Sequence, residues 1–332
     1  MQRALVALAA AGVGAMLPCE DALLKRTEMV TYGVNTDATL PSLGLDGFYV
    51  TTYAKLKERR GRMEARADKL GLQVRFVTGW DRELLTDEVV ACVYPSNALF
   101  ARTARAMNFK LTWMRIGEIS LNMKHAAAYY DAVARGHRHI LVCEDDAFFP
   151  DNFTTVVAEL LGGARAPASP SLASLALPSD YHVCFVCNYA RPTADELSRP
   201  QRLHRINPRE RVMHGACGYL VSQAGARWLL AHMPYQGPAD LQLAHWDYPS
   251  APPNRYTREP WPSWPDKLGS QQTQKLVAMF PRTADLQPCW GKACPPPELT
   301  RNVSEHILVA GRGPLRPLVQ SVRRRSPAGL AR

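Results

Sequence analysis

Blocks of apolar residues alternate with polar blocks from about residue 45 onward, and this alternation predicts strands and helices in turn. Residues 47–52 and 73–78 are short apolar runs typical of strands. Between them, residues 53–70 are rich in helix-forming side chains and are followed by Gly71, a common helix stop. A strand, a helix and a strand within about 30 residues is the βαβ signature of a parallel sheet.

Apolar residues at steps of three and four predict the longest helix at residues 116–135. A short apolar strand at residues 139–143 follows and runs directly into three acidic residues. Further strands are predicted at 181–187 and 216–221, and a further helix at 152–161. Ser222 is predicted to cap a helix that runs to about residue 233. We therefore expect an α/β protein with a mostly parallel central sheet flanked by helices.

The composition is that of a globular protein. Of the 332 residues, 46% are hydrophobic and 21% are charged, which excludes a wholly disordered, collagen-like or coiled-coil chain. The net charge is +10, but six arginines and no acidic residue lie in residues 311–332, so about +4 remains for the rest. We expect this tail to be disordered and basic, and no nucleic-acid module accompanies it.

The N-terminal segment, residues 1–17, predicts the compartment. Residues 4–17 carry no charged or polar side chain, and Arg3 precedes them. Fourteen apolar residues suit a signal peptide or a short anchor better than a spanning helix, which needs about 20. We expect the lumen of the endoplasmic reticulum or Golgi, with weak membrane association through the N-terminus. The alternative is an Ala-rich start without a targeting role.

The eight cysteines are an even number, which fits an oxidising compartment. Cys184 and Cys187 have the spacing of half a zinc site, but side chains three apart on a strand point to opposite faces, which opposes shared metal ligation. Cys289 and Cys294 flank a short loop and are the better candidates for a disulfide.

Glu144, Asp145 and Asp146 are the most informative feature of the sequence. Three adjacent carboxylates at the end of a buried strand repel one another and lose hydration. Mg²⁺ or Mn²⁺ resolves this conflict, since either ion takes carboxylate oxygens and keeps positions open for phosphates. Ligands of α/β sheets also bind at the carboxyl ends of the strands. The alternative is a solvated acidic turn that precedes the next helix.

Several motifs resemble glycosyltransferase family 25. They are Ile116-Gly117-Glu118-Ile119, Lys124-His125, Ile140 to Ala147, Phe48-Tyr49-Val50 with Arg59, Arg60 and Arg62, His214 to Ser222, and Asp240. Lys124 stands where the family pattern has Ser. The resemblance implies a GT-A-like nucleotide-sugar fold as a single domain over 45–300, with a nucleotide-binding half at about 45–160 and an acceptor half at about 180–300.

The family further implies a divalent cation, Mn²⁺ or Mg²⁺, and transfer of a sugar, often galactose from UDP-galactose, with inversion. By analogy with acidic motifs of this fold, Asp146 contacts the metal and Glu144 supports the ribose or the metal's surroundings. Asp145 is able to exchange roles with either, and His214 is a candidate third ligand or a structural residue. Inversion needs a base for the acceptor hydroxyl. Asp240 is the first candidate and Glu118 the second.

Three basic side chains complete the candidate site. Arg59 and Arg62 follow the first strand, where a guanidinium binds phosphates well; the alternative is an exposed basic helix face. His125 lies on a stripe with Glu118, and either faces the substrate or fixes the helix against the sheet. The favoured function is an enzyme acting on a UDP-sugar donor and a glycan or glycoprotein acceptor. The alternative is an inactive family member that binds sugars or glycoproteins.

Overall fold

The structure is a computed structural model. It describes residues 18–33, 39–94, 98–106, 113–164, 175–187, 202–206, 216–244, 251–259 and 264–265. The predicted signal segment 1–17, His214, the Cys289–Cys294 pair and the basic tail 311–332 lie outside the described residues. Among the described helices, none has the length and apolar character needed to cross a bilayer.

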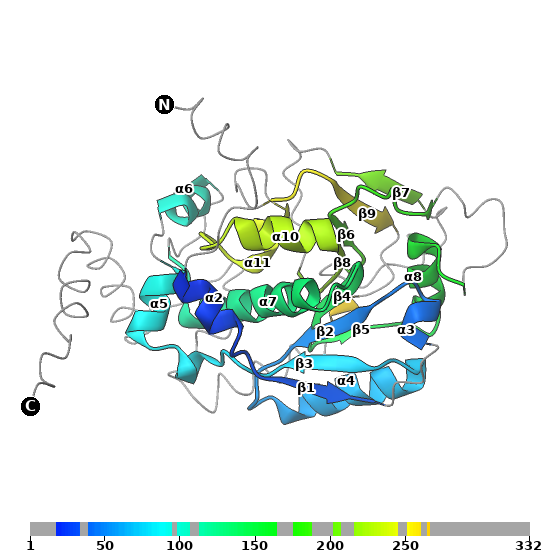
Figure 1. The fold of residues 1–332 in the computed structure, drawn as a ribbon, viewed down its shortest axis with the longest axis horizontal. Helices are drawn as coiled ribbons and strands as arrows, with labels where there is room; N and C mark the ends of the chain where they lie inside the picture. Colours follow the sequence, from blue (N-terminus) through cyan, green and yellow to red (C-terminus); the bar gives the residue numbers. More distant parts are fainter. Residues whose placement is uncertain are drawn as a thin grey trace, which may run out of the picture.

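A large sheet organises the described part of the chain (Figure 1). Its strands, in spatial order, are β1 (Met29–Tyr32), β3 (Val74–Val77), β2 (Gly47–Thr51), β4 (His139–Glu144), β8 (Gly218–Ser222), β6 (Val183–Phe185), β9 (Arg255–Glu259) and β7 (Arg202–Arg205). A separate two-stranded sheet joins β5 (Ala147–Phe148) to β10 (Trp264–Pro265). The predicted α/β class is confirmed.

The large sheet is mixed rather than mostly parallel. Strands β3, β2 and β4 run parallel, as the βαβ pattern predicts. Strand β8 is antiparallel to both β4 and β6, and β1 and β7 are antiparallel edge strands. Buried strands read as continuous apolar runs in either direction, so the sequence pattern of residues 216–221 contained no sign of β8's orientation.

Helices cover both faces of the sheet (Figure 1). The helices are α2 (Pro18–Leu24), α3 (Thr39–Ser42), α4 (Lys57–Leu70), α5 (Asp87–Val93), α6 (Ala98–Ala106), α7 (Ile116–Ala134), α8 (Phe153–Leu161), α10 (Gln223–Ala231) and α11 (Ala239–Ala244), with a 3₁₀ turn η1 (Arg82–Leu84). Alternate residues of β4 pack to opposite sides: Ile140 and Val142 toward α7 and α10, Leu141 and Cys143 toward α4 and α8.

The helix boundaries follow local signals in the sequence. Helix α4 ends at Gly71, whose φ of 64° is the left-handed conformation that glycine adopts without strain. Helix α10 begins after Ser222, whose hydroxyl accepts the Gly225 N–H, as predicted from its capping residue. Helix α4 starts at Lys57, four residues later than predicted, because residues 53–56 form a turn beside the site described below.

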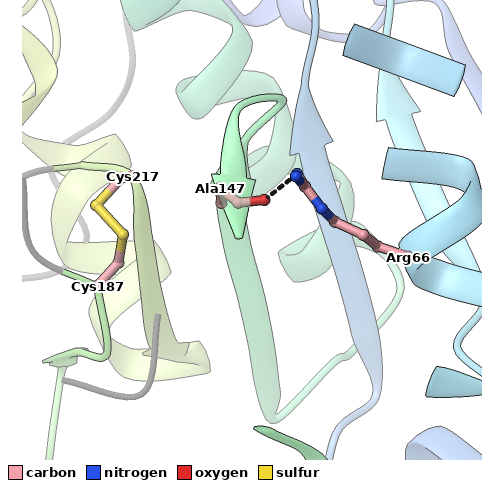
Figure 2. Close-up of a disulfide and its surroundings, with 4 residues drawn as sticks. All are labelled: Arg66, Ala147, Cys187 and Cys217. Carbon is pink, nitrogen blue, oxygen red and sulfur yellow. Dashed lines mark hydrogen bonds between the residues drawn. A yellow bond between two sulfur atoms is a disulfide. The ribbon is translucent and has the colours of Figure 1, made fainter. Parts of the chain in front are cut away.

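A disulfide joins Cys187, just after β6, to Cys217, just before β8 (Figure 2). Cys184 and Cys143 are buried thiols. The sequence did not indicate this pair, since its members are 30 residues apart and no local pattern links them. The bond joins two neighbouring strands at the end of the sheet where β4 also ends. There the Glu144 N–H donates to the Cys217 carbonyl over 3.2 Å.

Replacing both cysteines by serine should lower the free energy of unfolding by about 3–4 kcal/mol. The loss follows from the closed loop, since the disulfide spans a separation of 30 residues and restricts the unfolded chain. Urea denaturation of the Cys187→Ser/Cys217→Ser variant measures it, with Cys184→Ser as the matched single-thiol control. An unchanged midpoint would show that the bond does not constrain the unfolded chain.

Candidate active site

The three carboxylates lie at the carboxyl end of β4, beside the carboxyl end of β2. Because β2 and β4 are parallel, Thr51 is in register with Glu144, and Thr52 follows at the same edge. This edge is the usual ligand-binding position of an open α/β sheet. The predicted placement of the triplet at the end of a buried strand is confirmed.

Asp145 is the most deeply buried of the three, with a side chain 6% exposed. Both of its oxygens accept hydrogen bonds: Oδ2 from the Thr52 hydroxyl at 3.0 Å and Oδ1 from Arg59 Nη1 at 3.0 Å. Asp145 therefore connects the end of β4 to the turn after β2 and to the first half of α4. A carboxylate with two such donors is held in one orientation.

Arg59 is the cation that compensates this cluster, and its side chain is only 11% exposed. The same Nη1 also lies 3.4 Å from Asp146 Oδ2, so one guanidinium contacts two carboxylates. Burial lowers the pKa of Arg59, but the charges of Asp146 and Asp145 outweigh burial and raise it above its usual value. Arg62 lies one turn further along α4 and is partly buried.

Glu144 is the point at which the negative charges converge. Burial raises its pKa, and the charges of Asp146, Asp240 and Asp145 add to this effect, so that it reaches about 8 against an ordinary 4.5. Arg59 opposes the rise without cancelling it. The cluster therefore carries more negative charge than its own arginine balances, and Asp240 contributes to that excess although it is 96 residues away in sequence.

Asp240 reaches this region from the first turn of α11, where it is partly buried and its Oδ1 accepts the Leu241 N–H at 2.8 Å. The turn before α11 is anchored to α7, since the Gly237 carbonyl accepts from Asn122 Nδ2 at 2.6 Å. Gln242 Nε2, on α11 itself, donates to the same oxygen at 2.9 Å. Helix α7 thus fixes the position of Asp240, the residue predicted from the sequence as the base.

Glu118 and His125 lie elsewhere on α7. The Glu118 carboxylate accepts the Arg115 N–H at 2.7 Å and so caps the start of the helix. His125 is buried in the core, where its Nδ1 lies 2.7 Å from the Tyr219 hydroxyl. Burial lowers the pKa of His125 to about 3, which keeps its imidazole neutral. Both residues have a structural role; the roles predicted for them at the substrate stay predictions.

The buried His125 predicts a loss of stability in acid. The pKa of His125 is about 3 in the folded protein and 6.5 in the unfolded chain. As the pH falls below 6.5, the unfolded chain therefore binds a proton at this residue and the folded chain does not. Between about pH 7 and 5 this costs about 2 kcal/mol of unfolding free energy. His125→Gln, measured by urea denaturation at both pH values, should lose correspondingly less. Equal losses in both proteins would contradict the assignment.

Sequence reasoning missed three residues that contact the cluster or its supporting turns: Thr52, Asp81 and Lys124. Thr52 was detectable, because it follows a strand predicted to be parallel to the one that ends in the acidic triplet. Lys124 was noted only as a departure from a family pattern, although a lysine among alanines on a helix that faces the core is unusual. Asp81 follows the second predicted strand, at the same edge.

The strand β5 directly after the triplet is held against α4. Figure 2 shows Arg66 extending toward the carbonyl of Ala147, and its Nη1 donates to that oxygen at 2.7 Å. Within the described ranges, no three or more His, Cys, Asp or Glu side chains are grouped so that they would hold a metal ion by themselves. His214, predicted as a third ligand, lies outside those ranges.

The comparisons with known proteins identify the family. The family model described as "Glycosyltransferase family 25 (LPS biosynthesis protein)" matches residues 46–242, more than half of the chain. The chain belongs to glycosyltransferase family 25. The matched residues of this family 25 chain begin just before β2 and end within α11, so they include Arg59, the triplet and Asp240.

A curated relative is similar over a shorter stretch. A protein of Aedes aegypti described as "Glycosyltransferase 25 family member" is 28% identical over 123 residues, which is 37% of this chain. The match spans only 20% of the relative's own length. Family membership is thus shown by the match over residues 46–242.

Proposed function

We propose that this family 25 protein transfers a sugar, galactose, from a UDP-sugar to a hydroxyl group of a glycan or glycoprotein, with inversion at the anomeric carbon. The observation that carries the proposal is the convergence at Glu144 of charges from three further carboxylates, one of them on a distant helix, at the ligand-binding edge of the sheet. An excess of negative charge in a buried position is costly unless a ligand uses it.

A divalent cation accounts for this charge and for the binding of an anionic diphosphate beside the carboxylates. Carboxylate oxygens are the ligands that Mn²⁺ and Mg²⁺ prefer, and the raised pKa of Glu144 marks a surplus that a cation would offset. In this proposal Asp146 would hold the ion, with Asp145 and His214 as further candidate ligands. The ion supplies charge stabilisation to the departing diphosphate.

Arg59 and Arg62 bind the donor diphosphate from α4. Arg59 is already oriented by Asp145 and Asp146, so its guanidinium is fixed before the donor arrives. Glu144, at the end of the strand, supports the ribose of the nucleotide. These residues belong to the β2–α4 and β4 segments, which together form the nucleotide-binding half predicted at about 45–160.

Asp240 serves as the base for the acceptor, with Glu118 as the second candidate. The Asp240 carboxylate takes the proton of the acceptor hydroxyl while the hydroxyl oxygen forms a bond to the anomeric carbon. The bond from that carbon to the diphosphate oxygen breaks with its electron pair, which leaves UDP. Because the hydroxyl attacks from the face opposite the leaving group, the anomeric configuration inverts.

The proposed compartment is the lumen of the secretory pathway, with a weak membrane association through the N-terminus. The Cys187–Cys217 disulfide supports an oxidising environment, since reducing compartments rarely preserve such bonds.

The decisive test combines turnover with metal removal. Incubation with UDP-galactose and Mn²⁺ should release UDP and label a glycan or glycoprotein acceptor, chelation with EDTA should stop both, and added Mn²⁺ should restore them. Failure to bind any UDP-sugar, with or without metal, would overturn the function. Binding without turnover across an acceptor panel would favour the alternative, an inactive sugar-binding family member. Full activity in EDTA would overturn the metal requirement and leave the diphosphate to Arg59 and Arg62.

A further inference from the structure

Lys124 is a charged side chain buried in the middle of α7, and its side chain is 4% exposed. Lysine is almost never buried to this extent unless it is paired. Here its ammonium donates to the Gly79 carbonyl at 2.5 Å and to Asp81 Oδ1 at 2.7 Å. The ammonium group is therefore fixed to the turn that follows β3.

Asp81 also binds the turn that follows β2. The second oxygen of Asp81, Oδ2, accepts the Ala54 N–H at 3.0 Å. Ala54 lies two residues after Thr52, the donor to Asp145, and five residues before Arg59, the cation of the acidic cluster. Lys124 and Asp81 thus connect α7, the β3 turn and the segment that carries two of the partners of Asp145.

A second contact from α7 fixes the same β3 turn. The Ser120 hydroxyl donates to the Trp80 carbonyl at 2.5 Å, one helical turn before Lys124. Trp80 has a φ of 65°, a left-handed conformation that is rare for a bulky residue and persists only where the surroundings hold it. Its ring nitrogen donates to the Thr27 hydroxyl at 2.7 Å. The turn is thereby held from both sides in an otherwise unfavourable conformation.

Charge as well as contact links Lys124 to the site. Burial lowers the pKa of Lys124, and the hydrogen bond and charge of Asp81 and, more weakly, the charges of Asp145 and Glu83 oppose that lowering. A neutral side chain at this position would supply none of this attraction and would leave the Asp81 carboxylate buried without its cation. Such a carboxylate draws in water or shifts position, and Ala54 is bonded to it.

We infer that Lys124 is a positioning residue for the donor diphosphate: through Asp81 and the Ala54 N–H it fixes the turn that orients Thr52 and Arg59 on the acidic cluster. The inference rests on the proposed function for the identity of the ligand. Lys124 itself does not touch the donor. Its effect is therefore on donor affinity, whereas the affinity for the acceptor, which the proposed function places at Asp240 on α11, stays unchanged.

Donor binding by Lys124→Met and Asp81→Asn tests the role. Each variant should raise the KM for UDP-galactose, and the Kd for UDP with Mn²⁺, about tenfold or more, because a small displacement of Arg59 suffices for such a loss. The KM for the acceptor should stay within about twofold. Lys69→Met, at an exposed lysine on α4, is the matched control and should match the wild type.

The double variant Lys124→Met/Asp81→Asn controls for misfolding caused by one unpaired buried charge, since it removes both charges together. It should lose no more donor affinity than the worse single variant, because both residues act through one contact. A lower folded fraction with an unchanged donor KM would show a merely structural role and overturn the inference. So would unchanged donor affinity in a fully folded Lys124→Met protein.

Hydrogen exchange separates this inference from the proposed function, because it needs no nucleotide. The amides of residues 52–56 and 79–81 should exchange faster in Lys124→Met than in the wild type or Lys69→Met. If the wild type binds no UDP-sugar, the donor function fails, and the role of Lys124 toward the donor fails with it. If the wild type binds UDP while the variant shows wild-type exchange and affinity, only the role of Lys124 fails.

Discussion

Asp146→Asn should reduce sugar transfer by about 100- to 1000-fold while the protein stays folded. The substitution keeps the shape of the side chain and removes the charge that, in the proposed mechanism, holds the cation against the diphosphate. Asp146 is also one of the carboxylates that raise the pKa of Glu144, so its neutralisation relieves repulsion within the cluster. We expect the thermal midpoint of the metal-free variant to match or exceed that of the wild type.

Initial rates of transfer with saturating UDP-galactose and Mn²⁺ measure the loss, and a thermal melt in EDTA measures the stability. Asp151→Asn is the matched control: this aspartate lies five residues further on, its side chain is 79% exposed, and it pairs with Lys69 on the surface. It should retain wild-type activity. If the Asp146→Asn enzyme keeps more than about a tenth of the wild-type rate, the role proposed for Asp146 in holding the cation is wrong.

Local patterns in the sequence predicted the elements that place the site. The run of apolar residues before Glu144 predicted a buried strand. The βαβ pattern at residues 47–78 predicted the parallel pair β2 and β3, and β4 lies parallel beside β2, so the end of the sheet at which the carboxylates lie was predicted from the sequence. Helix α7 was predicted to within one residue at its end, because its apolar positions keep a strict helical period.

Partners across the fold were not predictable in this way. Lys124 and Asp81 are 43 residues apart, and Cys187 and Cys217 are 30 apart. Periodicity reports which face of an element is buried but not which residue it meets there. Strand β9 also escaped prediction, since it lies in a segment rich in proline and tryptophan and is identified by its pairing with β6 and β7.

Removing the cation of the cluster should have the largest effect on stability. Arg59→Met leaves Asp145 and Asp146 without the guanidinium that contacts both, at positions only 6% and 15% exposed. Loss of one partner of a buried ion pair costs about 3–5 kcal/mol, because the remaining charge stays desolvated. We expect a fall of this size in the unfolding free energy at neutral pH without divalent metal, as measured by urea denaturation.

Divalent metal should reverse part of that loss, and this links the stability of the cluster to its proposed chemistry. If the carboxylates hold Mn²⁺, the ion replaces the missing positive charge, and it stabilises Arg59→Met more than it stabilises the wild type. Lys57→Met, at the exposed start of the same helix, should show neither effect. Equal stabilisation of all three proteins by Mn²⁺ would show that the ion binds away from the carboxylates that Arg59 contacts, and the cation site proposed for Asp146 would then be wrong.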